Sequence, residues 1–258
     1  MIISWGDTLK ILLTNDDGIQ SAGLWSMANA LKAHGHSVTI TAPMYQQSGM
    51  AHALTVLREV EYKRLDNPDF DGWLFDGTPT DCVKIYLEAL STEKFDALIS
   101  GINDGANLAT DVLYSGTVGA ALEGFLHEIP SIAVSRDRES TIPFDEIAEL
   151  TIYYLEKVLA VQNEIFLHNV NFPKKFRTNK AELLLTRLGR RDYLNAFKSR
   201  TDDEGRTYFK IGGTACDLDD SEGTDIHAVN QGYVSVTPLN SDFADYYSLV
   251  ELRKIFQG

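Results

Sequence analysis

The strongest constraint on the fold is a regular alternation, over the first 160 residues, of short apolar runs with segments of helical periodicity. In one such segment Leu24, Met27, Ala28 and Leu31 recur with the spacing of a single helix face. Short, continuous apolar runs are typical of strands that are buried on both faces of a sheet. Such strands are expected at residues 11–13, 38–41, 97–99, 132–134 and 165–170. The alternation predicts an α/β fold with a doubly wound, mainly parallel sheet.

The chain from about residue 181 onward has a different pattern, which is rich in strand and turn signals. Residues 200–210 predict a hairpin, and residues 226–237 predict two strands joined by a turn. A short helix is expected near residues 245–255. We therefore expect two regions, an α/β core over residues 1–180 and a smaller strand-rich extension with a terminal helix, suited to oligomer contacts, over residues 181–258.

Composition excludes several classes of partner. The 258 residues include 37 acidic and 23 basic side chains, for a formal charge of -14. A dedicated binder of a nucleic-acid duplex or a membrane surface needs a basic face, which this balance argues against. Neither a membrane span nor a signal peptide is predicted, so a cytoplasmic protein is expected. Cys82 and Cys216 are too few for a disulfide framework and are expected to be reduced thiols.

Polar loops follow three of the expected strands. Asp16 and Asp17 follow the first strand, Ser48 lies in the loop after the second, and Asn103 lies in the loop after the strand at 97–99. Because parallel strands present their carboxyl ends at one edge of the sheet, these loops should converge there.

Adjacent carboxylates at a strand end suggest a cation site. Asp16 and Asp17 would repel each other without a cation, and their oxygen atoms suit Mg²⁺, Mn²⁺ or Ca²⁺. Alternatively, the two residues begin a helix, where aspartate is favoured by the helix dipole. No P-loop, paired-histidine zinc motif or serine nucleophile elbow occurs in the sequence.

A second group of residues favours an anion site. Ser115, Gly116 and Thr117 open an expected helix, where free N–H groups and hydroxyls suit a phosphate. The alternative is that Ser115 or Thr117 is only a helix cap. Asn103 and Asn107 on the same connection strengthen the anion interpretation. A hard divalent cation that faces a phosphate site suits the hydrolysis of a phosphate ester.

Longer motifs surround these residues, and together they span roughly residues 10–240. They are the segments 11–19, 47–49, 77–83, 100–107, 111–112, 114–124, 169–173 and 232–239. In this order they resemble the SurE (survival protein E) family of 5′-nucleotidases. The resemblance implies a Rossmann-like core and a metal-dependent phosphatase that cleaves nucleoside 5′-monophosphates, with 3′-monophosphates or polyphosphate as further substrates to test. It also implies a homodimer or homotetramer.

The resemblance also implies roles for particular residues. The family's ligands for Mg²⁺ or Mn²⁺ carry over onto Asp16, Asp17, Ser48 and Asn103, and its phosphate-binding region onto Asn107, Ser115, Gly116 and Thr117. One departure lies in the loop at 43–47, which has no charge where many relatives have Asp and Arg. This departure leaves base and sugar preference open.

These roles suggest a mechanism in which water attacks phosphorus. Asp17, with Asp16 as the second candidate, would orient or deprotonate that water, and Asn107 would help stabilise the phosphoryl oxygens. A rival chemistry passes through an aspartyl phosphate, but the Asp-x-Asp pattern usual for it is absent. Two other functions stay open: a non-catalytic, metal-dependent nucleotide-binding module, and a nucleotide-sugar binder of the glycosyltransferase type, which normally needs a longer chain.

Overall fold

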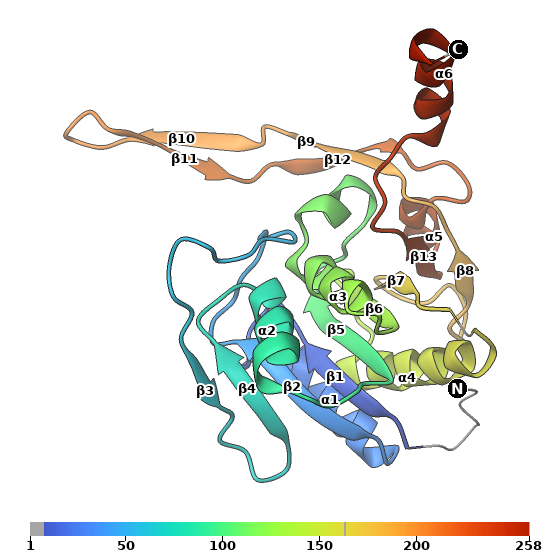
Figure 1. Ribbon diagram of the computed structural model, residues 1–258. Coiled ribbons are helices and arrows are strands. Elements are labelled where there is room, and N and C mark those ends of the chain that lie inside the picture. Colours follow the sequence, from blue (N-terminus) through green and yellow to red (C-terminus); the bar gives the residue numbers. More distant parts are fainter. Residues whose placement is uncertain (1–7, 163, 258) are drawn as a thin grey trace.

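The structure is a computed structural model that describes residues 8–162 and 164–257. Its centre is a nine-stranded sheet in the order β3-β4-β2-β1-β5-β6-β7-β13-β8 (Figure 1). The strands of this sheet are β1 (Lys10–Thr14), β2 (Ser37–Pro43), β3 (Tyr62–Arg64), β4 (Asp71–Phe75), β5 (Ala97–Asp104), β6 (Ser131–Arg136), β7 (Leu167–Phe172), β8 (Leu183–Leu185) and β13 (Val234–Leu239). The helices are α1 (Ala22–Ala33), α2 (Pro79–Ile85), α3 (Gly116–Leu126), α4 (Phe144–Val161), α5 (Asp225–Asn230) and α6 (Tyr246–Phe256). A π-helical turn, η1 (Tyr86–Leu90), continues α2, and a 3-10 helix, η2 (Ala109–Tyr114), precedes α3.

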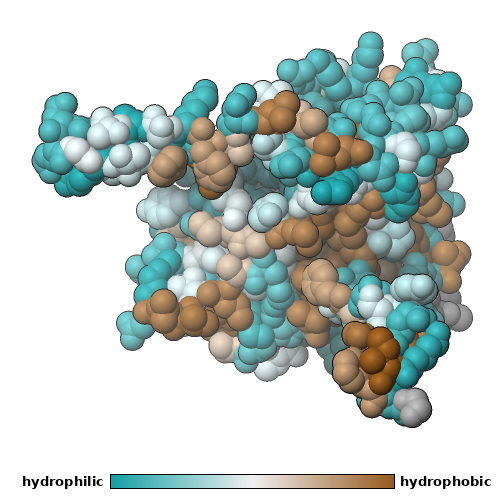
Figure 2. Space-filling model, turned by 90° about the horizontal axis from the view of Figure 1, so that it is seen from above, coloured by the Kyte–Doolittle hydropathy of each residue, from teal (hydrophilic) through white to brown (hydrophobic). Residues whose placement is uncertain are grey.

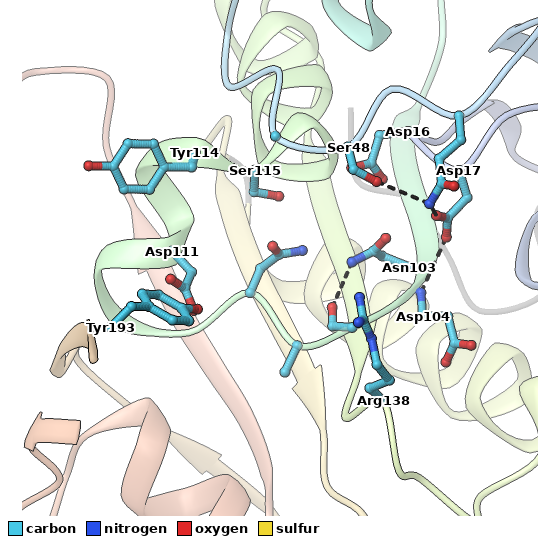
Figure 3. Close-up of a pocket in the computed structure, with 15 residues that line it drawn as sticks. Asp16, Asp17, Ser48, Asn103, Asp104, Asp111, Tyr114, Ser115, Arg138 and Tyr193 are labelled. Atoms are coloured by element: carbon cyan, nitrogen blue, oxygen red, sulfur yellow. Dashed lines mark hydrogen bonds between the residues drawn. The ribbon is translucent and has the colours of Figure 1, made fainter. Parts of the chain in front are cut away.

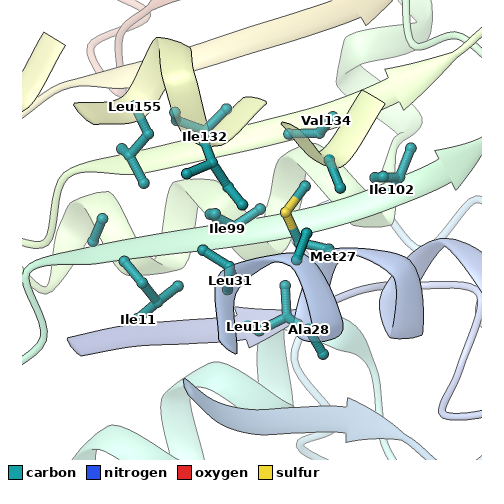
Figure 4. Packing of buried hydrophobic residues seen from close by; sticks show 14 of the residues in the cluster. Ile11, Leu13, Met27, Ala28, Leu31, Ile99, Ile102, Ile132, Val134 and Leu155 are labelled. Carbon is teal, nitrogen blue, oxygen red and sulfur yellow. The ribbon is translucent and has the colours of Figure 1, made fainter. Parts of the chain in front are cut away.

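The central strands β4, β2, β1, β5, β6 and β7 run parallel, as the alternation predicts. Leu12 of β1 lies between Thr39 of β2 and Leu98 of β5, and it faces the layer that contains α2 and α3. Its neighbours Ile11 and Leu13 face the opposite layer, which contains α1 and α4 (Figure 4). Each central strand is therefore buried on both sides, which confirms the doubly wound α/β fold.

Local signals account for part of this arrangement. Thr78 caps α2: its hydroxyl accepts from the N–H of Asp81, whose carboxylate accepts from the N–H of Thr78. The edge strand β3 and its neighbour β4 are not among the strands expected from the sequence. All three residues of β3 are exposed, and the apolar run of β4 covers only residues 73–75.

The segment 181–258 contributes to three structures. Strands β8 and β13 extend the large sheet, while β9 (Arg190–Leu194) pairs with β12 (Thr214–Asp219) and β10 (Phe197–Thr201) pairs with β11 (Thr207–Ile211). The two pairs form a long arm that projects from the core, and α6 stands apart at the end of the chain (Figure 1). The hairpin predicted at 200–210 and the helix predicted near 245–255 are confirmed. The domain division at residue 180 stays a prediction.

Of the two strands predicted within residues 226–237, the first is wrong. Residues there form the helix α5, because the hydroxyl of Thr224 caps it by accepting from the N–H of His227. Ile226 and Val229 lie three residues apart and are both buried on one face of this helix. The helix ends at Asn230, and Gly232, which follows its cap residue, has a φ of 84°. Only the second half of the segment forms a strand, β13.

A buried histidine makes the stability of the fold sensitive to acid. Burial lowers the pKa of His168 in β7 from its usual 6.5 to about 4; its Nδ1 lies 2.9 Å from the hydroxyl of Tyr154 and its ring stacks on Phe166. As the pH falls, the unfolded chain binds a proton on this histidine before the folded protein does. The contribution of neutral His168 to the free energy of unfolding is therefore complete above about pH 6.5 and is lost between about pH 6.5 and 4. We expect the wild type to lose about 2 kcal/mol more than His168→Gln between about pH 7 and pH 5, measured by urea unfolding. Equal losses of unfolding free energy in the wild type and in His168→Gln would contradict this role of His168.

Candidate active site

The four predicted metal ligands lie together at the carboxyl edge of the parallel sheet. They line a cavity of about 260 Å³ (Figure 3). Asp16 and Asp17 follow β1, Ser48 lies in the loop after β2, and Asn103 lies at the end of β5. The convergence of the three loops therefore follows from the parallel order β2-β1-β5.

Asp16 is the most buried acidic group of the cavity, with 5% of its surface exposed. Its Oδ1 accepts a hydrogen bond of 2.7 Å from the hydroxyl of Thr117. Burial raises its pKa to about 6, and the charge of Asp17 adds to this effect, while the hydrogen bond from Thr117 opposes it. A cation beside the two carboxylates would offset both unfavourable effects.

A neutral side chain links Asp17 to Ser48. The amide nitrogen of Gln46 lies 3.1 Å from Oδ1 of Asp17 and 3.0 Å from the Ser48 hydroxyl oxygen, and it donates to both. Oδ2 of Asp17 lies 3.3 Å from the backbone nitrogen of Asp104. The uncharged loop at 43–47 thus orders two predicted ligands through an amide.

Asn103 completes a set of four oxygen donors. Its amide nitrogen donates to the carbonyl oxygen of Gly105 at 2.6 Å. Figure 3 shows its amide oxygen on the side that faces Asp16 and Ser48. Two carboxylates, a hydroxyl and an amide oxygen form a hard donor set, which fits Mg²⁺ or Mn²⁺ and does not fit a soft metal.

Asn107 lines the same cavity and is held by two asparagines of β7. Its carbonyl oxygen accepts from the side chains of Asn169 and Asn171, and its backbone N–H donates to Asn171 at 2.8 Å. Its own amide nitrogen donates to the hydroxyl of Ser135 at 2.8 Å. The motif at 169–173 therefore has a structural role, which is to fix Asn107 at the cavity.

The other predicted phosphate-binding residues fall into two groups. Ser115 lines the cavity, although its hydroxyl also caps α3 by accepting from the N–H of Val118. Gly116 and Thr117 lie behind Asp16 and are not among the cavity-lining residues. A Cβ at Gly116 would lie 3.0 Å from the Cβ of Asp16, so this glycine permits the close approach of α3 to Asp16. The structure thus places Gly116 and Thr117 where they orient Asp16.

Several cavity residues were not identified as site residues from the sequence. Asp111 of η2 accepts from the hydroxyl of Tyr193 at 2.8 Å and pairs with Arg191 at 3.2 Å, so the β9 arm closes one side of the cavity. Tyr193 has no local signal, because its position depends on how the arm folds back. Arg138 follows β6, and attention to the end of every parallel strand would have identified it.

A second acidic cluster lies between η1 and α3. Glu88, Glu123 and His127 have ligand atoms within 4.8 Å of one another. The ammonium nitrogen of Lys84 lies 2.7 Å from Glu88 and 3.1 Å from Glu123, so a cationic side chain already compensates this cluster. The chemistry of this cluster favours a structural role over metal binding.

Comparison with known proteins agrees with this geometry. The family model described as Survival protein SurE matches residues 11–195. The chain belongs to the SurE family. This result confirms the resemblance seen in the sequence motifs.

Individual SurE proteins match almost the whole chain. The 5′-nucleotidase SurE of Heliobacterium modesticaldum is 43% identical over 97% of this chain and 93% of its own. That of Pelotomaculum thermopropionicum is 42% identical over 96% of both chains. The crystal structure of the SurE protein from Aquifex aeolicus has a TM-score of 0.79 and 38% identity, and the match covers 95% of this chain and 99% of that one. Within residues 8–162 and 164–257, no helix is long and apolar enough to cross a membrane.

Proposed function

We propose that this protein is a metal-dependent phosphatase that converts nucleoside 5′-monophosphates to nucleosides and phosphate. The observation that carries the proposal is the convergence of Asp16, Asp17, Ser48 and Asn103 beside Asn107 in one cavity. Relatives named 5′-nucleotidase SurE, at 42–43% identity over nearly the full chain, support the choice of substrate. The cytoplasmic location expected from the sequence stays a prediction.

The four oxygen donors would hold a divalent cation, which we propose to be Mg²⁺ or Mn²⁺. Such an ion, when bound, polarises a phosphoryl oxygen and lowers the pKa of water. Asp17 is the better candidate to orient the attacking water, because Asp16 is buried and its Oδ1 is occupied by the hydroxyl of Thr117. Asn107 and Ser115 would bind the phosphoryl oxygens from the α3 side of the cavity.

The rival route through an aspartyl phosphate has a different stereochemical outcome at phosphorus. Direct in-line attack by water is a single displacement and should invert the configuration of a substrate made chiral at phosphorus with oxygen isotopes. Retention of configuration would indicate two displacements through a phosphorylated aspartate and would overturn direct attack by water.

The function is tested by phosphate release from a panel of substrates. The panel contains nucleoside 5′- and 3′-monophosphates and polyphosphate, each assayed with Mn²⁺, with Mg²⁺ and with EDTA. We expect metal-dependent release from the 5′-monophosphates and none with EDTA. If metal binds and no substrate is cleaved, the alternative of a non-catalytic nucleotide-binding module is favoured.

We further propose that the protein is a homodimer or homotetramer. None of the residues of α6 is buried, although Leu252, Ile255 and Phe256 are apolar, and Figure 2 shows hydrophobic surface over this helix. Phe209 and Ile211 of the arm are also exposed. Apolar surface of this extent is typical of an interaction site. Sedimentation equilibrium should give two or four times the chain mass of 28.7 kDa, and a single-chain mass would contradict this proposal.

A further inference from the structure

Among the described residues that line the cavity, Arg138 is the one basic side chain. The cavity also contains four carboxylates, those of Asp16, Asp17, Asp104 and Asp111. A site with this balance would repel a phosphate ester unless positive charge were supplied close to the phosphate.

Two of the four carboxylates are already paired with arginines that lie outside the cavity. Arg136 pairs with Asp104 at 2.7 Å, and Arg191 pairs with Asp111 at 3.2 Å. Both arginines have further partners: Arg136 lies over the ring of Phe144, and Arg191 also pairs with Asp217 at 2.6 Å. The charges of these two guanidinium groups are therefore already paired with carboxylates in the walls of the cavity.

Arg138 differs from these arginines, because its guanidinium has no hydrogen bond or ion pair within the described part of the chain, where its side chain is exposed. Its backbone is nevertheless fixed. The N–H of Asp137 donates to the carbonyl of Phe172, and the carboxylate of Asp137 accepts from the N–H of Glu139. The short turn after β6 thus holds Arg138 on a backbone that is fixed by hydrogen bonds, while its guanidinium stays unpaired among the described residues.

The guanidinium of Arg138 is aimed at the predicted metal ligands. A Cβ built on Gly105 would lie 3.8 Å from its Nη2, and Gly105 is the residue whose carbonyl oxygen positions Asn103. Figure 3 shows the guanidinium beside the side chain of Asn103, and both lie close to Gly105. A phosphate bound next to Asn103 would therefore lie within reach of Arg138.

The charge balance of the cavity also favours contact between Arg138 and a bound phosphate. A divalent cation would neutralise Asp16 and Asp17, but a phosphate monoester adds a charge of about −1.5 to −2 near neutral pH. A guanidinium matches the geometry of phosphate oxygens and remains charged at all relevant pH values. We propose that Arg138 binds the phosphate group of the substrate directly, from the β6 side of the cavity. This inference rests on the proposed phosphatase function.

The test compares three variants with the wild type. Arg138→Gln removes the cation, Arg138→Lys keeps the charge but loses the planar fork, and Arg200→Gln removes the same charge from the exposed arm as a matched control. Inorganic phosphate is titrated into each Mn²⁺-loaded protein by calorimetry, and Mn²⁺ alone is titrated into each metal-free protein. Steady-state kinetics with a nucleoside 5′-monophosphate give KM and kcat.

We expect Arg138→Gln to weaken phosphate binding and raise KM by about tenfold to a hundredfold, as is typical for a charged hydrogen bond. Its affinity for Mn²⁺ should stay within about twofold of the wild type, since no metal ligand changes. Arg138→Lys should recover part of the loss, and Arg200→Gln should behave as the wild type.

Two results would overturn the inference. One is wild-type phosphate affinity in Arg138→Gln, and the other is an equal loss of phosphate and Mn²⁺ affinity, which would indicate a disturbed metal site. Absence of hydrolysis by the wild type would instead overturn the proposed function, and the phosphate titration would still decide the role of Arg138.

Discussion

Replacing Asp17 with Asn should lower metal-dependent phosphate release by about a hundredfold to a thousandfold, the magnitude seen when one electrostatic group of an active site is removed. The fold should survive, because Asp17 lies partly exposed at the cavity and the amide oxygen of Asn can still accept a hydrogen bond from Gln46. Mn²⁺ affinity should fall as well, since one charged ligand becomes neutral.

Asp16→Asn should separate activity from stability. The pKa of Asp16 is raised to about 6, so the ionised carboxylate destabilises the metal-free folded state above about pH 6, and this penalty disappears below about pH 4. Asn removes the charge, and the metal-free variant should be more stable than the wild type by about 1 kcal/mol near pH 8. Its metal-dependent activity should nevertheless be lost.

Both aspartate variants are checked by phosphate release with Mn²⁺ and by thermal unfolding in EDTA. Asp66→Asn, on an exposed loop away from the cavity, is the matched control and should change neither quantity. Turnover by Asp17→Asn within about tenfold of the wild type would contradict the role given to this carboxylate.

The second large effect is expected at Gly119 of α3. A Cβ at this position would lie 2.2 Å from the carbonyl oxygen of Ala51, in the loop that also contains Ser48. This loop is held in place on both sides: the N–H of Ala51 donates to the carbonyl of Tyr114, and His52 pairs with the buried Glu123 at 2.6 Å. Gly119→Ala must therefore displace the loop and, with it, a predicted metal ligand.

We expect Gly119→Ala to cost about 1–3 kcal/mol of stability, as overpacking does, and to reduce kcat/KM by at least tenfold. The direction of the stability change is informative, because Gly→Ala in a helix interior without a clash stabilises the protein by about 1 kcal/mol. Thermal unfolding and steady-state kinetics measure both effects. A raised melting temperature with unchanged activity would show that the loop does not need its close contact with α3.

The part of the site built by adjacent parallel strands could be predicted from the sequence. Asp16 and Ser48 follow buried strands and Asn103 lies at the end of one, and a parallel sheet brings such positions together whatever the details of packing. Asn107 and Ser115 lie on the connection that follows the third of these strands, so the same reasoning reaches them.

The remaining features depend on long-range packing. The hydrogen bond from the Thr117 hydroxyl to Asp16 joins α3 to the loop after β1, and no local pattern encodes it, while the predicted role of Thr117 in phosphate binding stays a prediction. Tyr193 reaches the cavity only because the arm is anchored to Asp111, and no local pattern encodes that contact. In α5 the buried Ile226 and Val229 fit a short strand as well as a single helical turn, and the cap at Thr224 decides between them.

The central claim is that the four oxygen donors at the sheet edge hold the catalytic metal. Anomalous diffraction at the manganese absorption edge, from crystals grown with MnCl₂ and a nucleoside product, locates the ion directly. We expect a peak bonded to the carboxylates of Asp16 and Asp17, with Ser48 and Asn103 beside it. A peak at Glu88, Glu123 and His127 in its place, or an empty cavity in crystals of protein that binds Mn²⁺ in solution, would contradict it.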